Sequence, residues 1–250
     1  MSGHSKWSSI KHQKGVADAR RGQLFTKLTR EIIVAVRQGG ASPDSNFRLR
    51  IAIQKARDSN MPMDNIERSI KKGSGESEGA SLVEITFEGY GPHGVAVLVE
   101  AMTDNRNRTV QEVRSVFSRH GGNLGESGSV AWNFENKGVI TVETDGMDAE
   151  DLSLLAIDAG AEDVIEGTGY LEIITTPQDL EAVRQAVEQK KAVASAEVSL
   201  VPKSTVTLGE KESLQVIKLL NHLEELDDVQ RVSSNVDFSD AVIEKSQSGA

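Results

Sequence analysis

Basic side chains recur along the first predicted helix at a spacing suited to binding phosphate groups. Over residues 17–38 the apolar positions Leu24, Leu28 and Ile32 repeat with a helical period. At about 100° per residue, four cations fall within roughly a 100° arc on the opposite side of that helix: Arg20, Lys27, Arg30 and Arg37. Outward Lys and Arg side chains are typical of proteins that contact a nucleic-acid backbone. The alternative is a charged face that only meets solvent.

A second predicted helix starts with Ser42 as its N-cap and Pro43 at its first position. Its apolar stripe is flanked on both sides by cations: Arg50 and Arg57 on one flank, Arg48 and Lys55 on the other. A short third helix is expected from about residue 64 to residue 72. We therefore expect helices that bury one side against each other and present Arg and Lys outward.

The segment that precedes these helices, residues 3–14, is basic and contains no acidic residue. It carries Lys6, Lys11, Lys14 and Trp7 but few apolar side chains, so core burial cannot order it and we expect it to be mobile until it meets a partner. Trp7 is suited to stacking on an unpaired base, and packing on the helical domain is an equal alternative. Together with Arg21, which follows Arg20, these residues complete the basic N-terminal candidates.

Charge is distributed unevenly between the two parts of the chain. The 250 residues carry a formal net charge of -10, but residues 1–72 hold 15 Lys and Arg against 6 Asp and Glu. The remainder holds 13 against 32. This asymmetry indicates a basic element for a polyanionic partner and an acidic remainder that avoids one. Chance clustering of solvated charges is the alternative.

A second, smaller basic cluster occurs in "TDNRNRT", residues 103–109. The segment joins a predicted strand to a predicted helix and places Arg106 and Arg108 at the helix N-terminus, where the helix dipole disfavours cations. Two arginines beside exposed helix N–H groups suit a phosphate or an RNA backbone. Alternatively, Asp104, Asn105 or Asn107 caps the helix and both arginines are solvated.

The sequence offers no support for catalysis, a metal or a cofactor. "GYGPHG" at residues 89–94 matches the dinucleotide-binding spacing, but a strand-like segment follows it, so we expect a hairpin turn. The chain has no cysteine, and its five histidines are scattered without metal-ligand spacing. We expect a non-enzymatic protein with no bound metal or cofactor and no small-molecule substrate.

The pattern of elements predicts an α+β fold with three domains. We expect a helical domain over residues 1–76, a discontinuous α/β domain over residues 77–135 and 204–240, an inserted domain over residues 136–203, and a flexible tail over residues 241–250. Residues 139–202 read strand–helix–strand–strand–helix–strand, the ferredoxin-like order, and the flanking elements resemble the halves of a second such unit. "SVAWNF", residues 129–134, is expected to be a strand.

Several long motifs resemble the YebC family, which includes the mitochondrial translational activator of cytochrome oxidase subunit one. The motifs are "GHSKWSSIKHQKGVADARRGQLFTKLTREI", "NMPMDNIERSIKKG", "FEGYGPHGVAVLVEAMTDNRNRT" and "GSVAWNF". The resemblance covers essentially the whole chain and implies a helical N-terminal domain followed by two α/β domains. It implies either a DNA-binding transcriptional regulator or a translation factor that associates with the ribosome and relieves stalls at proline-rich stretches, and no enzyme.

Of these functions we expect a translation factor that binds ribosomal RNA through its basic front. No recognition helix that exposes base-reading side chains is evident, and a basic arm with helices suits an irregular RNA surface. Duplex DNA bound through the same residues is the alternative, and a scaffold without nucleic acid is a third. The absence of a signal segment and of a long apolar run favours a cytoplasmic protein, and we expect a monomer.

Overall fold

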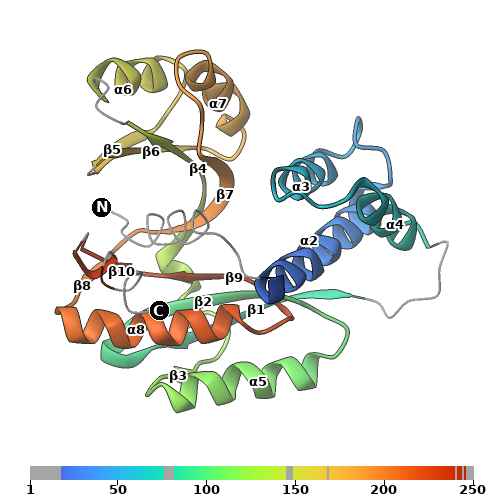
Figure 1. Ribbon diagram of the computed structural model, residues 1–250. Coiled ribbons are helices and arrows are strands. Elements are labelled where there is room, and N and C mark those ends of the chain that lie inside the picture. The colour runs from blue at the N-terminus through green and yellow to red at the C-terminus, as the bar shows by residue number, and fades with distance from the viewer. Residues whose placement is uncertain are drawn as a thin grey trace.

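The computed structural model describes residues 18–75, 82–144, 149–167, 169–239, 241–243 and 245. These residues form three units: a helical region, a central unit and an inserted unit whose strands lie between two parts of the central unit in the chain (Figure 1). The predicted α+β class is confirmed, since helices come first and two antiparallel sheets follow.

Three helices make up the helical region: α2 (Asp18–Gly39), α3 (Phe47–Asp58) and α4 (Met63–Gly73). They share one apolar cluster, to which α2 contributes the predicted stripe Leu28 and Ile32 and α3 contributes Leu49 and Ile53. Burial of this stripe stabilises each helix more than its intrinsic propensity does.

The start of α3 differs from the expectation. Ser42 and Pro43 lie in a turn, and Asn46 is the N-cap, accepting a hydrogen bond from the backbone N–H of Leu49 at 3.0 Å. The buried Asn46 amide also donates to the carbonyl oxygens of Ala35 and Gly40, each at 2.8 Å. One side chain thus satisfies the end of α2 and the beginning of α3, which places the helix start four residues later than predicted.

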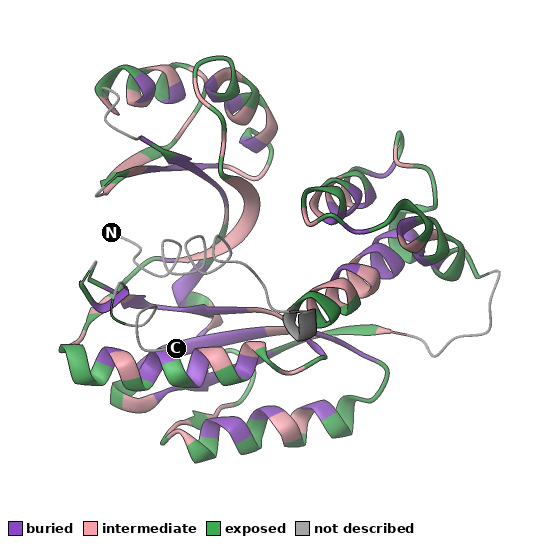
Figure 2. Cartoon of the chain, in the orientation of Figure 1, coloured by how far each residue is buried: buried purple, intermediate pink, exposed green. Residues whose placement is uncertain are grey.

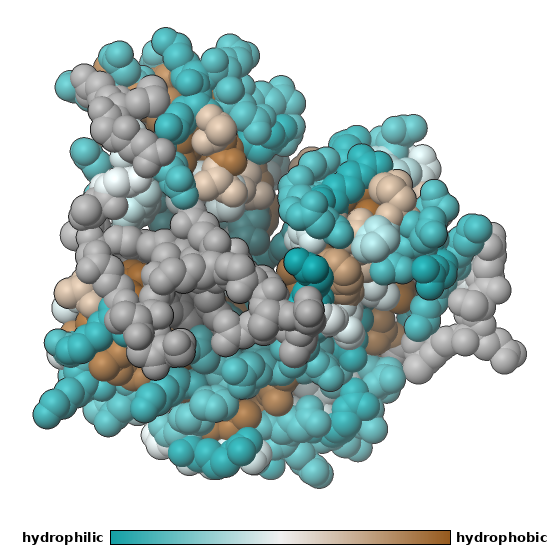
Figure 3. Space-filling view, viewed as in Figure 1, coloured by the Kyte–Doolittle hydropathy of each residue, from teal (hydrophilic) through white to brown (hydrophobic). Residues whose placement is uncertain are grey.

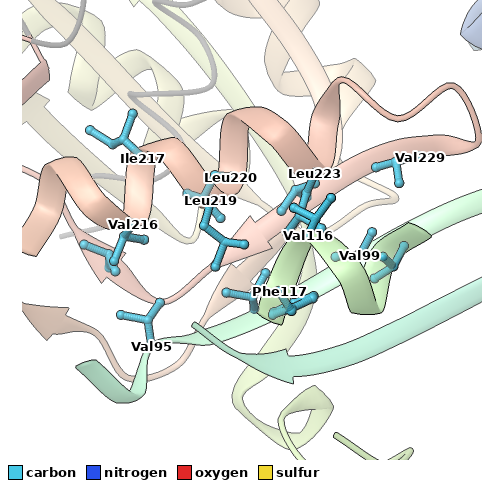
Figure 4. Packing of buried hydrophobic residues seen from close by; sticks show 14 of the residues in the cluster. Val95, Val99, Val116, Phe117, Val216, Ile217, Leu219, Leu220, Leu223 and Val229 are labelled. Atoms are coloured by element: carbon cyan, nitrogen blue, oxygen red, sulfur yellow. The ribbon is translucent and has the colours of Figure 1, made fainter. Parts of the chain in front are cut away.

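The central unit has a four-stranded antiparallel sheet in the order β3-β1-β2-β9. Its elements are β1 (Val83–Tyr90), β2 (Ala96–Thr103), α5 (Arg106–Arg119), β3 (Asn123–Leu124), α8 (Glu210–Glu224) and β9 (Val229–Ser234). Two short strands, β8 (Val206–Thr207) and β10 (Val236–Asp237), pair in parallel beside it. Figure 4 shows the core, in which Val99, Phe117, Leu219 and Leu223 meet between the sheet and the two helices.

The inserted unit has the predicted strand–helix–strand–strand–helix–strand sequence. It consists of β4 (Phe134–Glu143), α6 (Ala149–Asp158), β5 (Asp163–Gly167), β6 (Tyr170–Thr175), α7 (Leu180–Glu188) and β7 (Ser195–Pro202). The sheet order is β5-β6-β4-β7, and both helices cover one face of it (Figure 1). This order is that of the split βαβ, or ferredoxin-like, arrangement.

The two sheets share a spatial plan but not a chain order. In the inserted unit, β6 lies beside the edge strand β5 and is the third of the four strands in chain order. In the central unit, β1 lies beside the edge strand β3 and is the first strand in chain order. The central unit therefore opens with a β1–β2 hairpin, and this hairpin holds the "GYGPHG" turn as predicted, with a 3-10 turn at Pro92–Gly94. A Cβ at Gly89 would lie 2.9 Å from Phe117, so the close contact of strand and helix requires glycine.

Two further expectations are wrong. The segment expected to be a strand over residues 129–134 forms a 3-10 turn at Ala131–Asn133, and β4 begins only at Phe134. Val242 and Ile243, in the expected flexible tail, are buried in the central core. Figure 2 shows buried residues concentrated in strands such as β2, β4 and β6 and on the inner sides of the helices.

Candidate nucleic-acid interface

Part of the predicted basic set lies outside the described residues. This applies to Lys6, Trp7, Lys11 and Lys14, and for Arg20 only the backbone, in α2, is described. Arg21, in the first turns of α2, is exposed. The structure therefore bears on the helical cations from residue 21 onward, and it divides them into two groups.

One group is exposed at the C-terminal ends of the three helices. Arg37 lies in the last turn of α2, Arg57 in that of α3, and Lys71 and Lys72 in that of α4. All four side chains are exposed, and none forms an ion pair with any residue in the described ranges. We call them the outward set. Lys71 and Lys72 were missed as candidates, although two adjacent lysines at the end of a predicted helix are a visible signal; cations also complement the helix dipole at these positions.

Arg50 belongs to neither of the two groups of helical cations. Its guanidinium carbon is 5.5 Å from the centre of the exposed Phe47 ring. Glu181 of α7 has a pKa below its usual range, chiefly because it accepts hydrogen bonds from Arg184, and the charge of Arg50 contributes to the same direction. The charge of Arg50 thus acts on the inserted unit. The space-filling view shows a notch between two lobes of the molecule (Figure 3).

The second group, Lys27, Arg30, Arg48 and Lys55, contacts the other two units, and we call it the docked set. Lys27 donates to the carbonyl oxygen of Glu224 at 2.6 Å, and Arg30 donates to that of Asp227. Both acceptors lie at the C-terminal end of α8 or in the turn that follows. Helix ends leave carbonyl groups without intrahelical partners and carry partial negative charge, so cations bind well there.

Asp228, in the turn between α8 and β9, contacts side chains of both the helical region and the central unit. Arg30 of α2 lies 2.8 Å from one carboxylate oxygen, and Arg108 of α5 lies 2.7 Å from the other. The hydroxyls of Thr103 and Thr109 donate to the second oxygen at 2.9 Å and 2.6 Å. Burial by itself raises the pKa of Asp228, but these hydrogen bonds and the charge of Arg30 outweigh burial and lower it.

Two more contacts hold the helical region. Arg48 forms a two-armed contact with Glu84 at the start of β1, and Gln38 donates to the same carboxylate at 2.7 Å. These hydrogen bonds, above all that of Arg48, hold the pKa of Glu84 below its usual range. Lys55 lies 3.6 Å from Glu197 of β7 in the inserted unit.

The arginines of the 103–109 segment occupy the predicted helix N-terminus but differ from each other. Asn105 is the N-cap of α5 and accepts a hydrogen bond from the backbone N–H of Arg108 at 3.1 Å. The Arg108 side chain is held by Asp104 and Asp228. Arg106 is exposed and forms no ion pair with another described side chain. Of the two, Arg106 is the one available to an outside anion.

A glycine-rich loop beside the central sheet is organised by one buried carboxylate. Glu88 of β1 accepts backbone hydrogen bonds from Gly128, Val130 and Ala131 at 2.6 to 2.8 Å. Burial raises the pKa of Glu88, but these hydrogen bonds lower it by more, so the net pKa lies below the usual value. The loop leads to Trp132, which is 66% exposed. Neither Glu88 nor Trp132 was identified from the sequence; Glu88 binds a loop that begins 40 residues further along the chain, and only the fold brings the two together.

No described residues form a recognisable catalytic or metal centre. Clusters of three or more side chains able to hold a metal are absent from the described ranges. The fold does bring two histidines together: the rings of His120 and His222 lie 4.6 Å apart between α5 and α8. Burial, followed by the charge of His222, lowers the pKa of His120. No helix in the described ranges has the length and apolar character needed to cross a bilayer.

These features define an α+β protein of three units with a cation-rich helical region and acidic α/β units. Comparison with known families separates the helical region from the rest of the chain: residues 5–76 match the TACO1/YebC protein N-terminal domain, and residues 82–236 match the TACO1/YebC second and third domain. The chain belongs to the TACO1/YebC family.

Curated relatives and a solved structure agree over nearly the full length. A probable transcriptional regulatory protein of Dehalococcoides mccartyi is 64% identical over 251 residues, covering 100% of both chains. One from Natranaerobius thermophilus is 51% identical, covering 98% of this chain and 99% of its own. The crystal structure of a conserved hypothetical protein from Aquifex aeolicus is 52% identical, with a TM-score of 0.83, covering 92% of this chain and 96% of that chain.

Proposed function

We propose that the protein is a non-enzymatic, nucleic-acid-binding regulator of gene expression that acts in the cytoplasm on the ribosome. The observation that carries the proposal is the outward set, a group of exposed cations at the helix ends of the basic helical region in a chain whose remaining part is acidic. A polyanion binds such a surface by releasing its counterions, and the acidic units limit contact to that region.

The position of the outward cations favours RNA over duplex DNA. They lie at the ends of three helices rather than along one helix, whereas a helix-turn-helix reads bases with the side chains of a single recognition helix. Cations on separate helix ends suit the irregular backbone of a folded RNA. Since relatives carry the name of transcriptional regulators, duplex DNA bound by the same cations is the second candidate.

In the translation function, the helical region docks on ribosomal RNA and the α/β units face the interior of the ribosome. Arg106 at the N-terminus of α5 supplies a second phosphate contact. The protein would then assist a stalled ribosome, as at proline-rich stretches, by holding the reacting groups in position, and the ribosome's own RNA remains the catalyst.

The test is charge reversal in the outward set. We expect Arg37→Glu with Arg57→Glu to weaken binding to purified large ribosomal subunits by about tenfold or more and to reduce the slope of log affinity against log salt by about two. The matched control reverses two exposed cations outside the helical region, Arg114→Glu with Lys190→Glu, and should change little. Binding would be measured by co-sedimentation at several salt concentrations.

Other outcomes decide between the candidates. Tight, sequence-selective binding to duplex DNA that survives competitor ribosomal RNA would establish the transcriptional candidate. Equal losses from the test and control pairs would show that only total charge matters. Absence of binding to either polymer would leave a protein–protein scaffold and contradict the proposal.

A further inference from the structure

The docked set places four cations of the helical region on acceptors that resemble phosphate oxygens. Arg30 contacts one carboxylate oxygen of Asp228 and the carbonyl oxygen of Asp227. Arg48 contacts both oxygens of Glu84 with its two terminal nitrogens. A guanidinium that binds a carboxylate through two N–H groups has the geometry it uses on a phosphate.

These contacts follow one face of α2 and continue onto α3. Gln23, Lys27, Arg30 and Gln38 all contact the central unit, from the C-terminal end of α8 to the start of β1. Figure 1 shows the N-terminal end of α2 beside the turn between α8 and β9. Lys55 extends the docked surface to the inserted unit through Glu197. Basic side chains over two helices are thus covered by acidic parts of the same chain.

The cover is polar, and it can separate without stranding a buried charge. Asp228 keeps Arg108, Thr103 and Thr109 from its own unit if Arg30 leaves. The side chains of Glu84 and Glu197 are 41% and 36% exposed, so water replaces their partners at small cost.

Apolar packing across this junction is limited. The apolar clusters of the helical region and of the central unit share no residue. Ile33 and Val34 of α2 are also buried and belong to neither cluster. The contacts that join the helical region to the other units include several hydrogen bonds and ion pairs, which salt screens.

We propose that the docked set is a second phosphate-binding surface, covered in the free protein by carboxylates and carbonyl oxygens that occupy the places of phosphates. This inference rests on the proposed function and extends it. The outward set makes the first contact with RNA, and phosphates then replace Asp228, Glu84 and Glu197 on the docked cations. Because one guanidinium cannot bind both acceptors in this way at once, docking and full RNA binding exclude each other.

A reversible cross-link tests the exclusion. The side chains of Gln38 and Glu84 are 2.7 Å apart, and the chain has no cysteine of its own, so Gln38→Cys with Glu84→Cys introduces its only two thiols. A short bis-maleimide with a reducible disulfide in its linker would hold the helical region in the docked position. The control is the same variant with both thiols capped by N-ethylmaleimide.

We expect the cross-linked protein to bind purified large ribosomal subunits at least about tenfold more weakly than the capped protein, a difference of about 1.4 kcal/mol. Reduction of the linker should restore binding to the level of the capped protein. Equal binding by the cross-linked and capped forms would overturn the inference while leaving the proposed function intact. If neither form binds, the proposed function fails, and this inference fails with it.

Discussion

Two junctions join the units of this protein, and they differ in the forces that hold them. The helical region meets the rest of the molecule through the docked set, that is, through ion pairs and hydrogen bonds to Asp228, Glu84 and Glu197. The inserted unit meets the central unit through an apolar cluster of Ala96, Leu98, Val130 and Phe134, with Leu200 of β7 packed against it.

The apolar junction follows from the two-residue period of a strand. In β2 the side chains of Val97 and Val99 enter the core beneath α5 and α8, while those of Ala96 and Leu98 point to the opposite face. That second face is covered by the base of the inserted unit. Arg231 of β9 adds a polar contact there, lying 3.4 Å from Glu197, the same carboxylate that Lys55 reaches from the helical region.

The two junctions therefore respond to different conditions. Salt screens exposed charges and leaves apolar burial intact or strengthens it. We therefore expect the inserted unit to stay in place at ionic strengths that release the helical region. Under the proposed function, contacts that a polyanion can replace would let RNA reach the surface beneath this junction.

The largest effect is expected from Phe134→Ala, which opens a cavity in the apolar junction. Phe134 is 7% exposed, and removal of a buried phenyl ring costs about 3 kcal/mol or more of unfolding free energy. Urea unfolding at low and at high salt should show the same loss, and Phe134→Leu should lose less. A loss that grows or vanishes with salt would mean that charges, not apolar packing, dominate this junction.

Asp228→Asn is expected to cost about 2 kcal/mol, since a buried charged acceptor of several hydrogen bonds is lost. Because the folded pKa of Asp228 is lowered, its charge contributes stability that is complete above the ordinary carboxyl pKa of about 3.9 and is lost as the pH falls below it. Urea midpoints should therefore differ at pH 7 and converge in acid. A constant difference across this range would exclude the charge as the cause.

Glu84→Gln should change unfolding free energy by less than about 1 kcal/mol, because its ion pair with Arg48 is partly exposed. It should nevertheless lower the salt concentration at which the helical region separates. Energy transfer between dyes on Lys72→Cys and Gln178→Cys, placed on the helical region and the inserted unit, would follow that separation. The matched control is Glu166→Gln, which changes an exposed acid of β5. An equally large shift of the separating salt concentration in the control would contradict a specific role for Glu84.

The smallest effect concerns His120, which lies inside the central unit. Its pKa is lowered by burial and by the positive charges of His222, Arg119 and Lys218, so its neutral form is stabilising above the ordinary value of about 6.5. Stability should fall as the pH drops below that value, and His120→Asn should flatten the dependence. Neither junction should open over this pH range. Separation of the helical region within it would show that protonation of His120 is coupled to that junction.

Local signals in the sequence predicted the helices of the helical region, the strands of the inserted unit and the hairpin at "GYGPHG". These predictions succeed because each depends on side-chain period or on turn residues close in the chain. The prediction for the beginning of α3 was wrong because Asn46 forms hydrogen bonds to two helices at once, an arrangement that only their packing creates. The prediction of a strand over residues 129–134 was wrong because Glu88, from β1, accepts hydrogen bonds from the backbone of this segment.

A basic helical front, an acidic α/β remainder and one unit inserted in another could all be inferred from the amino-acid sequence. Charge counts and periodicity are properties of the chain, and they survive folding. Only the tertiary structure decided which cations are available. Lys27, Arg30 and Arg108 looked alike in sequence to Arg37, Arg57 and Arg106, but each of the first three binds an acceptor more than 100 residues away along the chain. A cation's partner depends on which surfaces meet, and that is fixed by the packing of whole units rather than by spacing along the chain.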